Sequence, residues 1–376
     1  MRTGNYIKQL QGDLGYKAFI PTNLPLNFTI DAELQNLLSK ADQALGRLDT
    51  VADIVPDVDF FILMYVRKEA TLSSQIEGTQ ATFVDVLKAE AKIEDTEVHQ
   101  DVDEVMNYIQ AMNYGLERLK TFPLSLRLIK EIHKKLLHGV RGEWKTPGEF
   151  RTSQNWVGGS SIQTATFVPP PHTEVLTLMG NLEKYLHDSS LTPVLIMAGI
   201  SHAHFETIHP FLDGNGRIGR LLVTFYLCQQ KILKQPLLYL SEFFKNNRQV
   251  YYDKLNAYRE KDDIEGWLKF YLEGVITTSE KAVDTAKKII KLREKNTIQI
   301  ATLGRSADKG MQLLNVLFKI PLVRIKDVER IVNLENPNAL NLVSKFEKLG
   351  ILREITNQKR NRVYSYIDYV SLFSSS

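Results

Sequence analysis

The residues best suited to chemistry lie together at positions 209–220, which read His-Pro-Phe-Leu-Asp-Gly-Asn-Gly-Arg-Ile-Gly-Arg. His209 is a candidate general base, because an imidazole titrates near neutral pH. Asp213 supplies a carboxylate of the kind that Mg²⁺ prefers. The tripeptide Gly214-Asn215-Gly216 leaves little side-chain bulk where a loop turns into a helix, so its N–H groups can face an anion. These residue types predict a site for the phosphates of a nucleotide.

Two arginines complete this stretch. Arg217 and Arg220 are three residues apart and therefore share one face of the predicted helix. A guanidinium group can hold a phosphate through two parallel hydrogen bonds. The stretch is not a Walker A loop, because no lysine follows its glycines. The alternative interpretation is a turn between two helices that carries incidental charges.

Three further segments could take part in the same site. Residues 154–157 and 165–168 flank a Gly-Gly-Ser-Ser tip and predict a β-hairpin, which three consecutive prolines then end. Residues 241–252 combine aromatic and amide side chains, which can sandwich a purine but can equally be core packing. Residues 73–78 read Ser-Ser-Gln-Ile-Glu-Gly, a polar helix end whose Ser73 and Glu77 share a face.

The 209–220 stretch resembles, at every defined position, the signature of Fic proteins: His-x-Phe-x-Asp/Glu-Gly-Asn-Gly-Arg-x-x-Arg. The resemblance implies transfer of AMP from ATP to a Ser, Thr or Tyr hydroxyl of a target protein, including the enzyme itself, with release of pyrophosphate. His209 would deprotonate the hydroxyl, and Asp213 would bind Mg²⁺. The residues expected at the nucleotide are Glu77, His209, Gly214, Asn215, Gly216, Arg217, Ile218, Gly219, Arg220 and Asn246.

The same resemblance assigns roles to two of the other segments. Fic proteins place a β-hairpin flap before the signature, and residues 156–167 look like it; its strand edge would pair with an extended segment of the target. Fic proteins also carry an inhibitory helix with the pattern Ser/Thr-x-x-x-Glu-Gly/Asn, which Ser73, Glu77 and Gly78 match. In the family this glutamate pairs with the second signature arginine, here Arg220, and blocks productive seating of the γ-phosphate. We therefore expect an autoinhibited adenylyltransferase.

The elements that must position these residues are mostly helical, by the three- and four-residue spacing of apolar side chains. Residues 1–30 are expected to be irregular and 303–310 to be a linker. Helices are predicted over 32–48, 57–75, 79–90, 98–119, 124–137, 174–187, 194–209, 216–230, 241–258 and 264–294. The fold class is therefore mostly α, a Fic helical core with a β-hairpin flap. We expect an N-terminal helical region with the inhibitory helix at 1–110, the catalytic core at 111–280 and a helix with linker at 281–310.

The C-terminal residues 311–376 form a separate module. Three predicted helices, 311–319, 324–332 and 337–349, precede a hairpin whose tip is rich in lysine and arginine, the order of a winged helix-turn-helix. Net charge also changes here: residues from Lys281 onward carry +9, whereas the rest carries −6 and the whole chain +3. This asymmetry suggests an acidic partner, so DNA and a docking protein remain open as partners of the module.

Composition and the remaining motifs limit the other functions. With 43% hydrophobic residues the chain is no disordered protein, and its single cysteine, Cys228, excludes a disulfide framework and a four-cysteine zinc site. The absence of a signal-like segment or a long apolar run predicts a cytoplasmic protein without membrane association. His202 and His204 lack zinc-protease spacing and are expected to be packed.

Two functional alternatives remain beside AMP transfer. One is removal of AMP from targets, with Glu77 positioning water. The other is a DNA-binding regulator whose core senses a nucleotide, although an intact His209 argues against it because a sensor needs no base. A homodimer is also compatible with the sequence.

Overall fold

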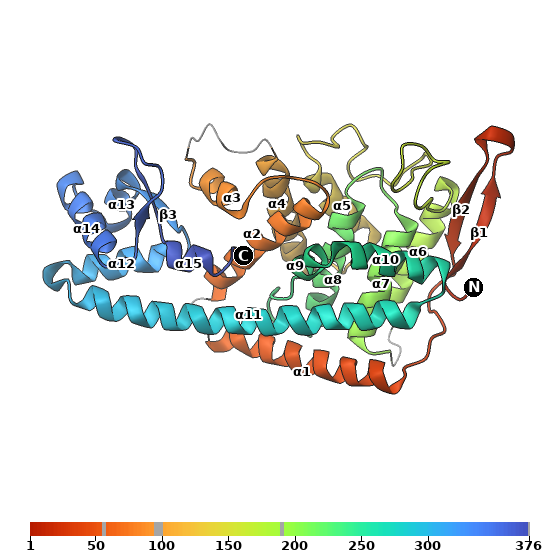
Figure 1. Cartoon of the computed structure of the whole chain (residues 1–376), viewed down its shortest axis with the longest axis horizontal. Helices are drawn as coiled ribbons and strands as arrows, with labels where there is room; N and C mark the ends of the chain where they lie inside the picture. The colour runs from red at the N-terminus through yellow and green to blue at the C-terminus, as the bar shows by residue number, and fades with distance from the viewer. Residues whose placement is uncertain (55–57, 94–100, 189–191, 375–376) are drawn as a thin grey trace. The chain divides into compact units, whose positions relative to one another are not determined.

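The computed structural model describes residues 1–54, 58–93, 101–188 and 192–374. These residues are mostly helical, as the sequence predicts (Figure 1). They form two compact units. The first contains 1–49, 72–79 and 103–280, and the second contains 50–71, 80–102 and 281–376. The start of the helix predicted over 98–119 lies outside the described residues.

The first unit is built from a hairpin and a set of helices. Its elements are β1 (Gly4–Gln9), β2 (Tyr16–Pro21), α1 (Ala32–Ile54), α4 (Val102–Leu119), α5 (Leu126–Leu136), α6 (Val175–Leu186), α7 (Val194–Ile208), α8 (Asn215–Gln229), α9 (Ser241–Asn246), α10 (Arg248–Glu260) and α11 (Ile264–Ala301). Short 3₁₀ turns occur at Gly12–Leu14 and His172–Glu174. The helices α1 and α11 continue into the second unit, as does α2 (Val58–Ile76).

The core of this unit is the pair α7 and α8. Every residue of α7 from Leu195 to Ile208 is buried. A helix that is buried around its whole circumference, polar side chains included, packs against protein on every side. Because α8 follows α7 after only six residues, the loop 209–214 is held at both ends by buried helices. The candidate reactive residues thus lie on a short loop between two buried helices.

Residues 4–21 form a hairpin, contrary to the irregular structure predicted for 1–30, whereas residues 22–30 contain no helix or strand, as predicted. β1 and β2 pair antiparallel from Gly4 with Pro21 to Gln9 with Tyr16. The opposed rings of Tyr6 and Phe19 pack edge-to-face with centroids 5.1 Å apart, a cross-strand pair that stabilises the hairpin. The single-sequence pattern missed it because its apolar residues are few and its turn is built around a 3₁₀ turn rather than a two-residue loop.

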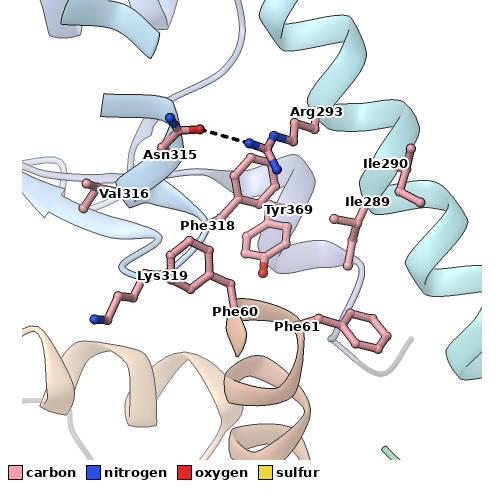
Figure 2. A pocket seen from close by; sticks show the side chains of 10 residues that line it. All are labelled: Phe60, Phe61, Ile289, Ile290, Arg293, Asn315, Val316, Phe318, Lys319 and Tyr369. Carbon is pink, nitrogen blue, oxygen red and sulfur yellow. Dashed lines mark hydrogen bonds between the residues drawn. The ribbon is translucent and has the colours of Figure 1, made fainter. Parts of the chain in front are cut away.

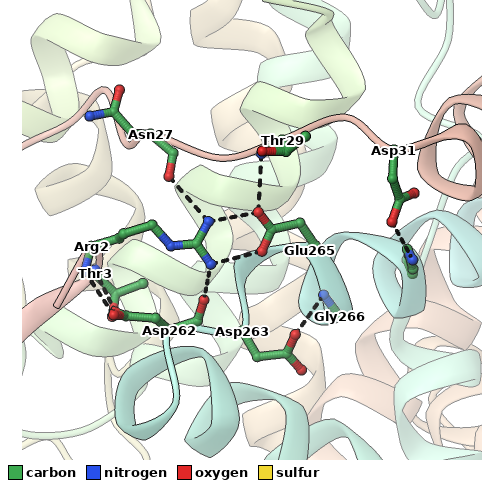
Figure 3. Close-up of polar contacts among 10 residues, drawn as sticks. Arg2, Thr3, Asn27, Thr29, Asp31, Asp262, Asp263, Glu265 and Gly266 are labelled. Carbon is green, nitrogen blue, oxygen red and sulfur yellow. Dashed lines mark hydrogen bonds and ion pairs between the residues drawn. The ribbon is translucent and has the colours of Figure 1, made fainter.

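A polar clamp fixes the start of this hairpin to α11 (Figure 3). The guanidinium of Arg2 donates to both carboxylate oxygens of Glu265 at 2.7 and 2.9 Å. The hydroxyl and N–H of Thr3 donate to Asp262. The Arg2 hydrogen bond lowers the pKa of Glu265 to about 2, so this carboxylate stays ionised at neutral pH.

Two other predictions for this unit differ in detail. The helix expected over 241–258 is two helices, α9 and α10, separated at Asn247. The hairpin expected over 154–168 contains one bridge pair, between Val157 and Phe167, rather than two strands. Gly158 and Gly159 both have positive φ directly after the bridge, and the prolines after Val168 cannot extend a ladder, so pairing stops at one residue on each side.

The second unit contains the first part of α2 together with α3 (Phe83–Glu90), α12 (Ala307–Leu317), β3 (Leu322–Arg324), α13 (Ile325–Val332), α14 (Asn336–Lys348), β4 (Arg353–Glu354), β5 (Val363–Ser365) and α15 (Ile367–Ser371). Its sheet has the order β3-β5-β4, with both pairs antiparallel. Strand β3 was not predicted, because three residues are too few for a periodic signal. The linker expected over 303–310 holds a 3₁₀ turn and the start of α12.

Candidate active site

His209 lies directly after α7, in a left-handed backbone conformation with φ 48°. Its N–H still donates to the carbonyl of Phe205 at 2.9 Å, so the helix ends at this residue. Its carbonyl accepts from Nε of the buried Arg151 at 3.0 Å. A left-handed conformation is costly for a residue with a side chain, and the Arg151 contact is one of the bonds that hold it. The imidazole is thus presented by a fixed backbone.

The loop after His209 is closed by a reciprocal pair of hydrogen bonds. The N–H of Phe211 donates to Oδ1 of Asn215 at 2.8 Å, and Nδ2 of Asn215 donates back to the Phe211 carbonyl at 2.8 Å. Gly214 takes φ 77° just before α8, a conformation that favours glycine. The buried Asn215 therefore stabilises the loop by hydrogen bonds to Phe211. The N–H groups at the start of α8 can then face an anion.

His133 supports the same loop from α5, and its protonation state can be assigned. Its Nδ1 accepts from the N–H of Gly148 at 2.8 Å, so Nε2 carries the proton and donates to the carbonyl of Asp213 at 2.9 Å. Burial lowers the pKa of His133 to about 4, which keeps the ring neutral. The ring also stacks on Phe211, with centroids 3.7 Å apart.

The first signature arginine is tied to two carboxylates. Arg217 is buried, and its guanidinium lies 3.3 Å from Oε2 of Glu104 and 3.4 Å from Oδ1 of Asp213. Glu104 is itself buried and contacts Arg141 at 3.3 Å through its other oxygen. The side chain of Asp213 remains one-third exposed, at 34%. Asp213 thus keeps a solvent-facing carboxylate while Glu104 neutralises the arginine behind it.

Replacement of Glu104 by glutamine tests this support. Glu104→Gln leaves Arg217 buried with less compensating charge, and we expect the free energy of unfolding to fall by about 1–3 kcal/mol. The measurement is urea denaturation followed by circular dichroism. Glu117→Gln is the matched control, because the exposed Glu117–Lys120 pair is expected to contribute less than about 1 kcal/mol. Equal losses in both variants would refute a structural role for Glu104.

The second signature arginine contacts the 73–78 segment at both of its ends. Nε of the buried Arg220 donates to the hydroxyl of Ser73 at 2.8 Å, and one terminal nitrogen donates to the Ser73 carbonyl at 2.9 Å. The same nitrogen lies 2.8 Å from Oε1 of Glu77. Burial would raise the pKa of Glu77, but the charge and hydrogen bond of Arg220 outweigh it and lower the pKa, so the carboxylate is ionised.

Gly78 and Gly216 make the geometry of Glu77 possible. Gly78 has φ 103° and follows the last turn of α2, where its N–H donates to the carbonyl of Gln75. A Cβ on Gly216 would clash with the Glu77 carboxylate. The Glu77 carboxylate therefore occupies space directly against the start of α8, where the N–H groups and Arg220 meet. This is the position in which an anionic group of a ligand would be held.

The electrostatic surroundings of His209 keep its ring neutral. Burial lowers its pKa to about 4, and the charges of Arg151 and Arg259 act in the same direction. Because the lowered pKa lies below neutral pH, the unprotonated form that can accept a proton is already the resting form. Its Nδ1 has no hydrogen-bond partner among the described residues. The charge of Glu77 and the Glu206 backbone act to raise the pKa of His209, but burial outweighs them.

Glu206, one helical turn before His209, has a role that was not predicted: the sequence suggested it only as part of a zinc site with the nearby histidines, which their spacing disfavours. It is 8% exposed, and its Oε1 has no hydrogen-bond partner in the described part of the chain. Burial raises its pKa to about 7. A Cβ on Gly219 would clash with this oxygen, so Gly219 is the residue that lets α8 approach it. The i, i+3 spacing from His209 was the available signal.

Asn246 is exposed at the end of α9, next to residues that contact the end of α2. Nζ of Lys245 lies 2.6 Å from Oε1 of Gln75, and the guanidinium of Arg248 donates to the Ile76 carbonyl at 3.1 Å. The aromatic residues of 241–252 were expected either to contact a purine or to pack in the core. Phe244 and Tyr251 are buried and stack on each other at 4.4 Å, which is core packing.

His202 and His204 are packed, as expected. His202 is buried, with Nδ1 donating to the Gly219 carbonyl at 2.8 Å and Nε2 accepting from the Tyr251 hydroxyl at 2.9 Å. His204 is also buried, and burial lowers its pKa to about 3. Ile218 is buried in α8 and faces the core. Of the residues expected at the nucleotide, Glu77 contacts Arg220 and lies against Gly216.

Further polar residues that support the loop came only from the structure. Arg151 donates to the carbonyls of His209 and Pro170, and Asn155 donates to the carbonyl of Phe211 at 2.9 Å. Both precede the Val157–Phe167 bridge, so the bridge segment is tied to the His209 loop through backbone carbonyls. The sequence gives no signal for such residues, because the carbonyls of His209 and Phe211 lie more than fifty residues away along the chain.

Comparison with known proteins identifies two matching family descriptions. The Fic/DOC family N-terminal region matches residues 35–117, and the Fic/DOC family matches residues 123–227. Curated relatives include the protein adenylyltransferase Fic of Drosophila virilis, 30% identical over 216 residues, which are 56% of this chain and 40% of that protein. The same protein of Drosophila ananassae is 31% identical over 48% of this chain and 33% of its own length. The chain thus spans less than half the length of these relatives.

Solved structures show a related fold. A Fic family protein from Desulfovibrio desulfuricans aligns with a TM-score of 0.59 over 90% of this chain and 97% of its own, at 20% identity. A Fic domain containing signaling protein from Bacteroides thetaiotaomicron aligns with a TM-score of 0.50 over 68% of this chain and 97% of its own, at 21% identity. Among the described residues, no helix is long and apolar enough to cross a membrane.

Proposed function

Because this chain belongs to the Fic/DOC family, we propose that it is a protein adenylyltransferase that transfers AMP from MgATP to a Ser, Thr or Tyr hydroxyl of target proteins, itself included, and that Glu77 holds it inactive. One observation carries the proposal: Glu77 lies 2.8 Å from Arg220 and against Gly216, in the place suited to a phosphate. A carboxylate and a phosphate oxygen compete for the same guanidinium hydrogen bonds.

The nucleotide would be held by the start of α8 and by its two arginines. The free N–H groups after Gly214 favour an anion at a helix N-terminus, and Gly216 lets a phosphate approach the backbone closely. Asp213 fits a Mg²⁺ ion, since its carboxylate is partly exposed and a Mg²⁺ site needs one or two carboxylates beside the phosphates of the substrate. When bound, the ion would neutralise phosphate charge.

We assign to His209 the role of accepting the proton of the target hydroxyl. A hydroxyl attacks phosphorus more readily as its proton leaves, and a neutral imidazole with a free nitrogen can take that proton. Burial lowers the pKa of His209, and the charges of Arg151 and Arg259 add to this effect, so the ring stays in the accepting form. The bond from the target oxygen to the α-phosphorus then forms as the bond to pyrophosphate breaks.

Residues 156–167 are proposed as the target-docking flap. The segment has one bridge pair, and Trp156 beside it is 43% exposed. An extended target segment could add its backbone to such an edge, which would set the register of its hydroxyl. The hydrogen bonds of Arg151 and Asn155 to the His209–Phe211 carbonyls support a fixed distance between the flap and the base.

We also propose that residues 311–376 are a winged helix-turn-helix. The order α12-β3-α13-α14-β4-β5 and the sheet order β3-β5-β4 support this assignment. The module would bring the enzyme to a partner, DNA or protein, that complements its positive charge.

The proposal is tested by intact-protein mass spectrometry. Glu77→Gly protein incubated with MgATP is expected to gain the mass of one or more AMP groups, because the freed Arg220 can hold the phosphates. Wild-type protein incubated with the modified product tests the reverse reaction, for which the ionised Glu77 could orient water. A Glu77→Gly protein of unchanged mass, with no modified target in an added lysate, would contradict the proposal.

A further inference from the structure

A cavity of about 280 Å³ lies within the second unit (Figure 2). Four aromatic side chains line it: Phe60, Phe61, Phe318 and Tyr369. They come from the first turn of α2, from the end of α12 and from α15, so three elements distant in the sequence supply the walls. The volume is near the lower end of the range of about 300–1,000 Å³ that is usual for small-molecule sites.

Two cationic side chains line this cavity, Arg293 and the exposed Lys319. Arg293 on α11 donates to Oδ1 of Asn315 at 3.3 Å, and its guanidinium carbon lies 5.9 Å from the centre of the Phe318 ring. Among the described residues, no carboxylate oxygen lies within ion-pair distance of Arg293. Other arginines of this unit, such as Arg67 and Arg324, do have carboxylate partners. Arg293 therefore offers donors to an anion at an apolar cavity.

We propose that this cavity binds a small aromatic carboxylate. A planar ring would pack among the phenyl side chains, which prefer offset or edge-to-face contacts with other rings. Its carboxylate would meet Arg293, whose planar fork binds carboxylates through two hydrogen bonds, while Asn315 holds the fork in place. The limited volume favours a molecule of one or two fused rings over a nucleotide or a long acyl chain.

A ligand in the cavity would contact α2, the helix that also carries Ser73 and leads to Glu77, so its binding is expected to affect the proposed AMP transfer. Phe60 and Phe61 lie at the start of this helix, and Ser73, which accepts from Arg220, lies near its end. A helix is continuous at about 1.5 Å per residue, so a shift imposed on the rings at its start bears on the residues at its end. We expect occupancy to change the rate of AMP transfer; this step rests on the proposed inhibitory role of Glu77.

Isothermal titration calorimetry of the full chain with 1-naphthoate tests the site directly. We expect saturable binding to the wild type, at least tenfold weaker binding to Arg293→Gln, and similarly weak binding of the neutral analogue 1-naphthalenemethanol. Lys291→Gln is the matched control, because it removes one exposed charge from the same helix outside the cavity and should bind as the wild type does. Circular dichroism establishes that each variant is folded.

The outcomes distinguish ligand binding in the cavity from an effect of that binding on AMP transfer. No saturable binding, or equal binding by the wild type and a folded Arg293→Gln, would overturn the proposed site. Val316→Phe, which adds bulk to the lining, provides a second variant and should also lose binding. Binding that leaves AMP transfer by the wild type unchanged would overturn the link to α2 but not the site. Because calorimetry needs no catalysis, a failure of the adenylyltransferase proposal would not affect the binding result.

Discussion

Glu77→Gly is expected to raise the initial rate of AMP incorporation by about 5- to 150-fold over the wild type, the range usual for relief of a coupled inhibitory contact. The physical reason is the ion pair at 2.8 Å between Glu77 and Arg220, which occupies donors that a phosphate needs. The substitution also removes the carboxylate that packs against Gly216 and so opens the space at the start of α8. The measurement is incorporation of label from [α-³²P]ATP into protein.

Two companion variants make this result specific. Glu149→Gly removes an exposed carboxylate from a loop and should leave the rate at the wild-type level. Ser73→Ala removes the hydroxyl that accepts from Nε of Arg220 and should raise the rate less than Glu77→Gly does, since the carboxylate remains. An equal rate for Glu77→Gly and the wild type would contradict autoinhibition by this residue.

Removal of the imidazole is expected to have the second large effect. In the Glu77→Gly background, His209→Ala should lower the rate of AMP transfer by about 10²–10⁴-fold, the usual contribution of a positioned general base. Affinity for ATP should change little, because the groups proposed to hold phosphates belong to α8 and its preceding loop. Rates come from label incorporation, and ATP affinity comes from equilibrium dialysis.

The control for this variant is a second histidine. His138→Ala in the same background removes an exposed imidazole and should retain full transfer. If His209→Ala retained transfer while ATP binding fell, His209 would be a binding residue and not the base. The expected pattern is the opposite one, a lost rate with retained affinity.

Much of the site could be predicted because its chemistry is contiguous in the sequence. His209, Asp213 and the two arginines fall within one loop and one helix turn, so local spacing was enough to group them. The pairing of Glu77 with Arg220 spans 143 residues and could be expected only through the family resemblance. The structure places the two groups within ion-pair distance, and the inhibitory role of that contact stays a prediction.

Residues that act through long-range backbone contacts could not be predicted. Glu104 reaches Arg217 across 113 residues, and Arg151 reaches the His209 carbonyl across 58. Neither lies in a recognisable pattern, because a single buried contact imposes no periodicity on its neighbours. The N-terminal hairpin was missed for a related reason: its pairing depends on one cross-strand aromatic contact and on the clamp to α11.

The helices were predicted well where nearly every residue of the helix is buried. α7 and α8 agree with their predicted ranges within one residue or two, and the 241–258 segment failed at Asn247, where the backbone leaves the helical region for φ −115°, ψ 35°. A break of one residue does not disturb the spacing of apolar side chains on either side. Tertiary packing, rather than local preference, decided that boundary.

The most direct test of AMP transfer compares the position of the label in ATP. Glu77→Gly protein is incubated with Mg²⁺ and either [α-³²P]ATP or [γ-³²P]ATP, and labelled protein is separated from free nucleotide. The account predicts that the α label becomes bound to protein and that the γ label leaves in pyrophosphate, because His209 directs a hydroxyl to the α-phosphorus. Protein labelled from the γ position and not from the α position would contradict it.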